Sequence, residues 1–179
     1  LDPIKDQTIA VIGYGIQGDA QANNMKDSGL KVIVGLREGS PTWNKAKDDG
    51  HEVMSVTDAT KKADIVHILI PDMVQAKVYK EEIAPNLSEG KALSFSHAAA
   101  IYWKWIDAPE NVDLIMVAPK GPGSKVRETY LQNFGTPSIV AVEQDKTGKA
   151  WDRTLGIAKA IGSARAGLIQ TTFKEEVET

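Results

Sequence analysis

The chain has 179 residues, which is close to the roughly 150 residues of one domain. Its formal net charge is −3 and it contains no Cys, so disulfides, thiolate metal sites and a cysteine nucleophile are excluded, and no basic excess points to nucleic acid. No apolar run is long enough to span a membrane and the first residues carry no signal-peptide pattern, so we expect a cytoplasmic protein.

Short apolar runs alternate with helical stretches along the chain. The expected strands cover residues 8–12, 31–34, 65–70, 92–95, 114–118 and 138–142. The expected helices cover residues 17–27, 57–63, 73–82, 124–132 and 150–161. Strands that are apolar throughout are typical of parallel sheets covered on both faces. The alternation therefore predicts an α/β fold with a mostly parallel sheet.

A glycine-rich turn directly follows the first expected strand and opens the first expected helix. It reads Gly13-Tyr14-Gly15-Ile16-Gln17-Gly18, the G-x-G-x-x-G pattern in the context where it binds a dinucleotide. Gly13 permits the tight turn, Gly15 lets the backbone approach a pyrophosphate, and Gly18 allows the helix to pack close to the strand. The pattern predicts a Rossmann-type, doubly wound sheet with helices on both faces. A glycine-rich turn without a ligand is the alternative.

The end of the second expected strand predicts which dinucleotide is bound. A site that prefers NAD places an acidic residue there for the ribose 2′-hydroxyl, whereas this chain has Gly35. The loop that follows carries Arg37, Ser40 and Thr42, whose side chains can bind a 2′-phosphate. We therefore expect NADP(H). In the alternative interpretation Arg37 is a solvated loop charge.

Three further loops follow expected strands at the sheet edge where ligands bind in this topology. They begin at Pro71, Ser96 and Pro119. In the second loop His97 is a candidate catalytic residue, and in the third Lys120 can bind an anionic substrate. A structural histidine and a surface lysine are equally compatible with the spacing. Of the other histidines, we expect His67 in the core and His51 at the surface.

These residues resemble the N-terminal, NADP-binding domain of ketol-acid reductoisomerase (acetohydroxy acid isomeroreductase) of the shorter, microbial class. The resemblance covers essentially all 179 residues, and its most specific segments are 10–15, 34–40, 71–79, 116–123 and 171–176. It implies an oxidoreductase of isoleucine and valine biosynthesis, part of branched-chain amino acid biosynthesis. The substrate of such an enzyme is 2-acetolactate, a 2-hydroxy-2-methyl-3-keto acid, or 2-aceto-2-hydroxybutyrate. The enzyme uses Mg²⁺ to shift an alkyl group in this substrate. It then reduces the product with NADPH to a 2,3-dihydroxy acid.

The resemblance also implies roles for individual residues. His97 and Lys120 match catalytic positions. The cofactor-binding positions are Gly13, Tyr14, Gly15, Ile16, Gln17, Gly18, Arg37, Ser40, Thr42, Pro71, Asp72, Met73, Val74, Gln75 and Gly123. The chain departs from the usual family pattern at Ile16, at Asp19, which adds negative charge near the phosphates, and at Ala98-Ala99-Ala100 after the candidate catalytic histidine.

The last residues predict the start of a helix, because residues 172–175 read as a capping box. The resemblance implies that the carboxylates for Mg²⁺ lie beyond this point, in a C-terminal domain. We therefore expect residues 1–172 to form the NADP-binding domain and 173–179 to begin a truncated helix, with no metal site in the chain. The parent enzyme would be a homo-oligomer through the absent domain, and the isolated chain would be inactive.

Two other functions remain open at this stage. One is a free-standing NADP-binding or sensing module without catalysis. The other, ranked last, is a β-hydroxyacid-type dehydrogenase without its helical domain, because the segment 119–123 differs from what that type predicts.

Overall fold

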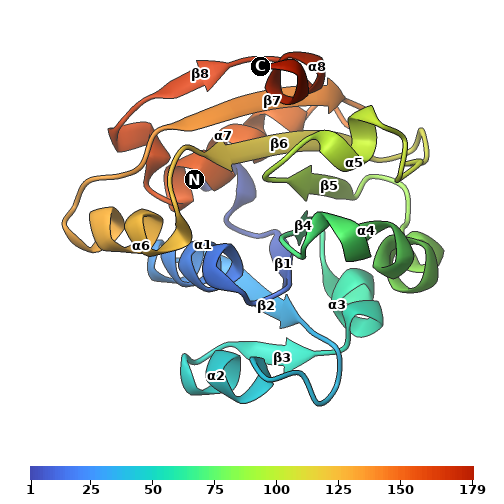
Figure 1. Ribbon diagram of the computed structural model, residues 1–179, viewed down its shortest axis with the longest axis horizontal. Coiled ribbons are helices and arrows are strands. Elements are labelled where there is room, and N and C mark those ends of the chain that lie inside the picture. Colours follow the sequence, from blue (N-terminus) through green and yellow to red (C-terminus); the bar gives the residue numbers. More distant parts are fainter.

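The computed structural model describes residues 1–179, which form one eight-stranded sheet with helices on both faces (Figure 1). The strands are β1 (Thr8–Ile12), β2 (Lys31–Gly35), β3 (Glu52–Met54), β4 (Ile65–Ile68), β5 (Ala92–Phe95), β6 (Asp113–Pro119), β7 (Ser138–Gln144) and β8 (Leu168–Gln170). Their order in the sheet is β3-β2-β1-β4-β5-β6-β7-β8. All neighbours are parallel except β6 and β7. The predicted Rossmann-type, mostly parallel sheet is confirmed.

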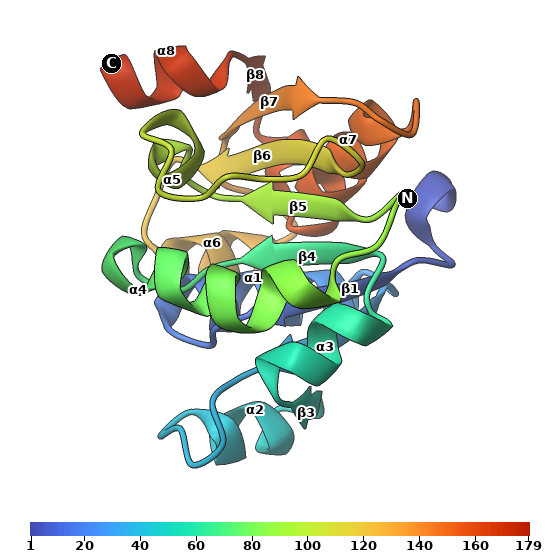
Figure 2. The same ribbon diagram turned by 90° about the vertical axis from the view of Figure 1, so that its right-hand side faces the viewer.

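Eight α-helices connect or flank these strands. They are α1 (Ile16–Asp27), α2 (Trp43–Asp48), α3 (Val56–Lys62), α4 (Asp72–Val78), α5 (Ala99–Tyr102), α6 (Gly123–Leu131), α7 (Ala150–Ala160) and α8 (Phe173–Glu178). A π-helical turn (Tyr79–Ile83) continues α4, and single 3-10 turns cover Asp2–Ile4, Ala84–Asn86 and Ser163–Arg165. Figure 2 shows α8 beside α5, at the end of the sheet where β7 and β8 lie.

The sheet separates two apolar cores, which explains why the strands are apolar throughout. In β1, Ile9 and Val11 pack with α1 and α7 on one face, whereas Ala10 and Ile12 pack with α3 on the other. Successive side chains of a strand point to opposite faces, so both sets must be apolar when both faces are covered. Neither face of the central strands is left for water.

Four short elements were not predicted from the sequence, namely β3, β8, α2 and α5. The expected third strand, β4, ends at Ile68 rather than at residue 70. Three to six residues carry too little periodicity to distinguish a strand or helix from a loop. The predicted capping box is half formed. Thr172 Oγ1 accepts from the backbone N–H of Glu175 at 3.1 Å, while the Glu175 carboxylate accepts from the Thr171 hydroxyl instead.

The strand order reverses at the carboxyl ends of β1 and β4. These strands are neighbours, and the chain leads from β1 toward β2 on one side and from β4 toward β5 on the other. Ligands of doubly wound sheets bind outside such a reversal of strand order. The predicted site residues follow β1, β2, β4, β5 and β6, so the fold brings their loops to one edge of the sheet.

Candidate functional site

The glycine turn between β1 and α1 has the shape of a phosphate-binding turn. Gly13 has φ +101°, in the left-handed region that favours glycine, and its N–H donates to Gly35 O at 3.1 Å. A Cβ on Gly18 would lie 2.4 Å from Gly13 O, so close packing of helix on turn requires glycine there. A Cβ on Gly15 would meet no atom within 4 Å. The open space above Gly15, at the N-terminus of α1, leaves room for a pyrophosphate.

The side chains of this turn point in different directions. Ile16 is 72% exposed, while Tyr14 is buried and its hydroxyl donates to Asp49 Oδ2 at 2.6 Å. Burial, together with the hydrogen bond to Asp49, raises the pKa of Tyr14 above its usual range, so the phenol stays protonated. Tyr14 therefore offers a ligand its backbone and not its hydroxyl. The carboxylate of Asp19 lies 2.7 Å from Lys45 Nζ, so its expected negative charge is balanced by a neighbouring cation.

The loop after β2 presents an unpaired cation. Arg37 is exposed and makes no ion pair or side-chain hydrogen bond within the chain. A tight turn follows, in which Ser40 N donates to Arg37 O at 2.9 Å and Gly39 has φ +79°. The hydroxyls of Ser40 and Thr42 lie 3.2 Å apart. These three side chains, which the sequence assigned to a 2′-phosphate, thus stand on one short loop with the guanidinium free to bind an anion.

The loop after β4 exposes apolar side chains at this edge of the sheet. Met73 is 90% exposed and Val74 is exposed beside it, at the N-terminus of α4. Gln75 is buried, and its amide N–H donates to Ile70 O at 2.8 Å. Its Oε1 is buried without a hydrogen-bond partner. The loop therefore offers a ligand the side chains of Met73 and Val74, whereas Gln75 is turned into the protein.

His97, after β5, is held by a carboxylate that the sequence did not point to. Its Nδ1 lies 2.9 Å from Glu176 Oε1, and the other oxygen of Glu176 accepts from the backbone N–H of Ala98 at 3.0 Å. The Glu176 side chain is only 6% exposed. Because a carboxylate accepts hydrogen bonds, the neutral form of the ring carries its proton on Nδ1 and its lone pair on Nε2. Asp72 Oδ2 lies 3.9 Å from that Nε2.

Removing the carboxylate should release the ring of His97. We expect Glu176→Ala to replace the single Nδ1–H tautomer by a mixture of tautomers, since the ring then meets only water and Asp72. Histidine ¹⁵N chemical shifts at a pH where the ring is neutral measure this. Glu175→Ala, one residue away and exposed, is the matched control and should leave the His97 signals unchanged. An unchanged tautomer in Glu176→Ala would contradict the assignment.

The loop after β6 packs against the glycine turn. Gln17 Nε2 donates to Gly121 O at 3.0 Å, and a Cβ on Gly123 would lie 2.3 Å from Ile16 O. The starts of α1 and α6 are therefore in close contact, which explains the need for glycine at residue 123. Lys120 is exposed and makes no side-chain hydrogen bond or ion pair, and none joins it to His97.

The prediction that His51 is exposed is wrong. His51 is buried, and its Nε2 lies 3.0 Å from Asn23 Oδ1. Burial lowers the pKa of His51 below its usual value. We predicted exposure because residues 49–50 form a turn, but the chain turns back there onto α1. The prediction for His67 is confirmed, since the ring is fully buried.

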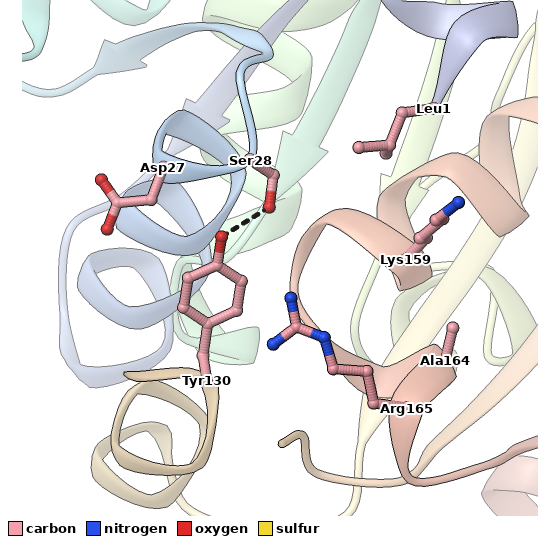
Figure 3. Close-up of a pocket in the computed structure, with 7 residues that line it drawn as sticks. All are labelled: Leu1, Asp27, Ser28, Tyr130, Lys159, Ala164 and Arg165. Atoms are coloured by element: carbon pink, nitrogen blue, oxygen red, sulfur yellow. Dashed lines mark hydrogen bonds between the residues drawn. The ribbon is translucent and has the colours of Figure 1, made fainter. Parts of the chain in front are cut away.

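A separate concavity of about 520 Å³ lies at the opposite end of α1 from the glycine turn. Its lining is Leu1, Asp27, Ser28, Tyr130, Lys159, Ala164 and Arg165 (Figure 3). The hydroxyls there are already paired, because Tyr130 Oη lies 2.7 Å from Ser28 Oγ, which donates to Ala160 O. None of the predicted site residues lines it.

No group of three or more His, Cys, Asp or Glu side chains has an arrangement that could hold a metal ion. The helices are all too short or too polar to cross a membrane.

Comparisons with known proteins identify relatives along the whole chain. Residues 3–167 match the family described as "Acetohydroxy acid isomeroreductase, NADPH-binding domain". The ketol-acid reductoisomerase (NADP(+)) of Nitrosopumilus maritimus strain SCM1 is 86% identical over all 179 residues, which cover 54% of the relative. That of Cenarchaeum symbiosum strain A is 78% identical, with the same coverage. The chain thus spans about half the length of the curated relatives it matches.

A solved structure agrees with the sequence comparison. An NADH-preferring ketol-acid reductoisomerase from an uncultured archean superposes with a TM-score of 0.96 at 50% identity, over 97% of this chain and 54% of that one. A family match that covers most of the chain, together with relatives aligned from its first residue to its last, leaves one assignment. The chain belongs to the acetohydroxy acid isomeroreductase (ketol-acid reductoisomerase) family and corresponds to that family's NADPH-binding domain.

Proposed function

We propose that this chain is the cofactor-holding part of a ketol-acid reductoisomerase that acts in branched-chain amino acid biosynthesis. The substrate would be 2-acetolactate or 2-aceto-2-hydroxybutyrate and the product a 2,3-dihydroxy acid, with the assembled enzyme a homo-oligomer in the cytoplasm. The observation that carries the proposal is the open space at Gly15, which follows β1. In the sheet, β1 lies between β2, which leads to the free guanidinium of Arg37, and β5, which leads to the imidazole of His97. NADP(H) needs its pyrophosphate, its 2′-phosphate and its nicotinamide received at three such places.

Each part of the proposed site has a role that follows from its chemistry. The glycine turn would bind the pyrophosphate with backbone N–H groups, and Arg37, Ser40 and Thr42 would bind the 2′-phosphate. The exposed side chains of Met73 and Val74 would exclude water from one side of the nicotinamide. When bound, the reduced nicotinamide supplies the hydride for the reduction.

His97 and Lys120 would act on the substrate. With Nδ1–H held by Glu176, the neutral ring of His97 would offer the lone pair of Nε2 to a hydrogen bond or a proton from a substrate hydroxyl. Lys120, with its ammonium unpaired, would bind the substrate carboxylate. The residues of this chain do not fit the Mg²⁺ that the reaction needs. We therefore propose that carboxylates of a second domain hold the metal, and we assign it no step here.

The test is titration calorimetry of the 179-residue chain with NADPH and NADH, paired with a turnover assay on 2-acetolactate with Mg²⁺. We expect NADPH to bind more tightly than NADH and expect no turnover, because the chain offers no metal site. Failure to bind either nucleotide would contradict the proposed site. Turnover by a homogeneous preparation would contradict the assignment of the metal to a second domain. Mixing with a separately produced second domain is the positive control, and should restore activity.

A further inference from the structure

A fully buried histidine lies beneath the candidate site and takes no part in the proposed mechanism. His67, in the middle of β4, is 0% exposed. Its Nδ1 lies 2.7 Å from Ser94 Oγ on β5, and its Nε2 lies 2.7 Å from Gln21 Oε1 on α1. Burial lowers the pKa of His67 to about 4, so at neutral pH the ring carries one proton and stays uncharged. Both ring nitrogens are therefore committed to hydrogen bonds within the protein.

From His67 a chain of hydrogen bonds leads to the loops of the site. Gln21 Nε2 donates to Gln17 Oε1 at 3.0 Å and to Ser96 Oγ at 3.2 Å. The Ser96 hydroxyl donates to Val117 O at 2.8 Å, and Gln17 Nε2 donates to Gly121 O at 3.0 Å. The network thus joins the glycine turn, the loop after β6 and the residue next to His97.

Two backbone carbonyls determine the direction of every bond in this network. Gly121 O and Val117 O can only accept, so the amide nitrogen of Gln17 and the hydroxyl of Ser96 must donate to them. The Gln17 oxygen then faces Gln21, whose nitrogen must donate to it. The remaining Gln21 oxygen requires a donor, and only the Nε2–H of His67 faces it. His67 is therefore the Nε2–H tautomer, and its Nδ1 accepts from Ser94.

We propose that His67 is a positioning residue for the glycine turn, acting through Gln21 on the side chain of Gln17. This inference rests on the proposed function. Gln17 is the side chain that joins the glycine turn to the loop after β6. Without the proton from His67, the Gln21 amide has a buried oxygen with no donor and gains by rotating away, which releases Gln17. When Gln17 is released, the glycine turn is less ordered before NADP(H) binds. Part of the binding free energy is then used to order the turn, so the affinity for NADP(H) falls.

Two amide substitutions separate the two sides of the ring. In His67→Gln the amide nitrogen can stand close to where Nε2 stood and donate to Gln21. In His67→Asn the shorter amide can reach only toward the Nδ1 side, facing Ser94, and Gln21 Oε1 is left unpaired. Ser94→Ala is the matched control, because it removes a partner of His67 without interrupting the path to Gln17. For each variant we would measure the Kd for NADPH by calorimetry and the free energy of unfolding in urea.

We expect His67→Asn to raise the Kd for NADPH about tenfold, and His67→Gln to stay within about threefold of the unchanged chain. Ser94→Ala should lower stability while leaving the Kd within about twofold. Kd values that are equal in all variants, or that follow the loss of stability whichever side of the ring is altered, would overturn the proposal.

A second measurement is made on the unchanged chain, so it does not depend on whether a variant folds. It also distinguishes a failure of the positioning role of His67 from a failure of the proposed function. Histidine ¹⁵N shifts of the unchanged chain should show His67 as the Nε2–H tautomer, and the side-chain amide protons of Gln17 and Gln21 should exchange slowly with water. An Nδ1–H tautomer or rapid exchange would overturn the positioning role even if NADPH binds. A chain with the expected network that binds no NADPH would instead contradict the proposed function.

Discussion

Replacing Arg37 by Asp is expected to weaken the binding of NADPH about 100-fold while changing the binding of NADH less than about threefold. The guanidinium has no hydrogen-bond or ion-pair partner in the chain. Its removal therefore leaves no other group without a partner, and the effect is confined to ligand binding. Charge-assisted hydrogen bonds contribute about 1.5–3 kcal/mol, and the new carboxylate would repel the 2′-phosphate, which NADH lacks. Calorimetry with both nucleotides measures the difference.

A matched control separates a local effect from a general change in charge. Lys47→Asp makes the same change at an exposed site on α2, the helix that follows the loop. It should leave the ratio of the two Kd values near that of the unchanged chain. If Arg37→Asp lowered both affinities equally, or if Lys47→Asp reproduced its selectivity, the assignment of Arg37 to the 2′-phosphate would be wrong.

The fold alone does not decide this preference. The NADH-preferring relative superposes with a TM-score of 0.96, and the Nitrosopumilus maritimus relative carries the name NADP(+). The match of backbones therefore does not by itself predict which nucleotide this chain prefers. The side chains of the loop after β2 remain as the source of discrimination in this chain, which is why the test is made at Arg37.

Gly15→Ala and Gly18→Ala are expected to change different properties. The first should lower the affinity for the nucleotides, and the second should lower the stability of the chain. At Gly15 the added methyl group meets no protein atom within 4 Å and the backbone has φ −77°, so the free energy of unfolding should change by less than about 1 kcal/mol. The methyl group would occupy the space proposed for the pyrophosphate. The affinities for NADPH and NADH should therefore fall together, by at least about 30-fold.

At Gly18 the methyl group would lie 2.4 Å from Gly13 O and 2.9 Å from Gly13 C. Backbone must move to relieve this overlap, which should cost about 2–3 kcal/mol of stability. Urea unfolding and calorimetry on both variants check the contrast. Normal NADPH binding by Gly15→Ala would show that the space above this residue does not receive the pyrophosphate. Unchanged stability of Gly18→Ala would contradict the tight contact between turn and helix.

The sequence predicted the features that depend on neighbours along the chain. The glycine turn is such a feature, because the conformation of Gly13 and the start of α1 are set within a few residues. The central strands are another, since burial on both faces leaves a continuous apolar run. From these, the common edge for Arg37, His97 and Lys120 followed by topology, because parallel strands carry their carboxyl ends to the same side.

Where side chains point was decided only by tertiary contacts. Tyr14 turns inward because Asp49, 35 residues later, accepts its hydroxyl. His97 has a defined tautomer because Glu176, 79 residues later, is carried to it on α8 beside α5. No periodicity relates such pairs, since the contact requires several intervening elements to pack first.

By itself, then, the sequence determined the class of fold, the cofactor turn and the list of loops at the site, since each depends on local conformation or on strand order. The tertiary structure alone decided the hydrogen-bond partner of His97, the charge balance at Asp19 and the path from His67 to Gln17. The reason is physical. A buried polar group must find a partner wherever the fold places one, and that position is a property of packing and not of spacing along the chain.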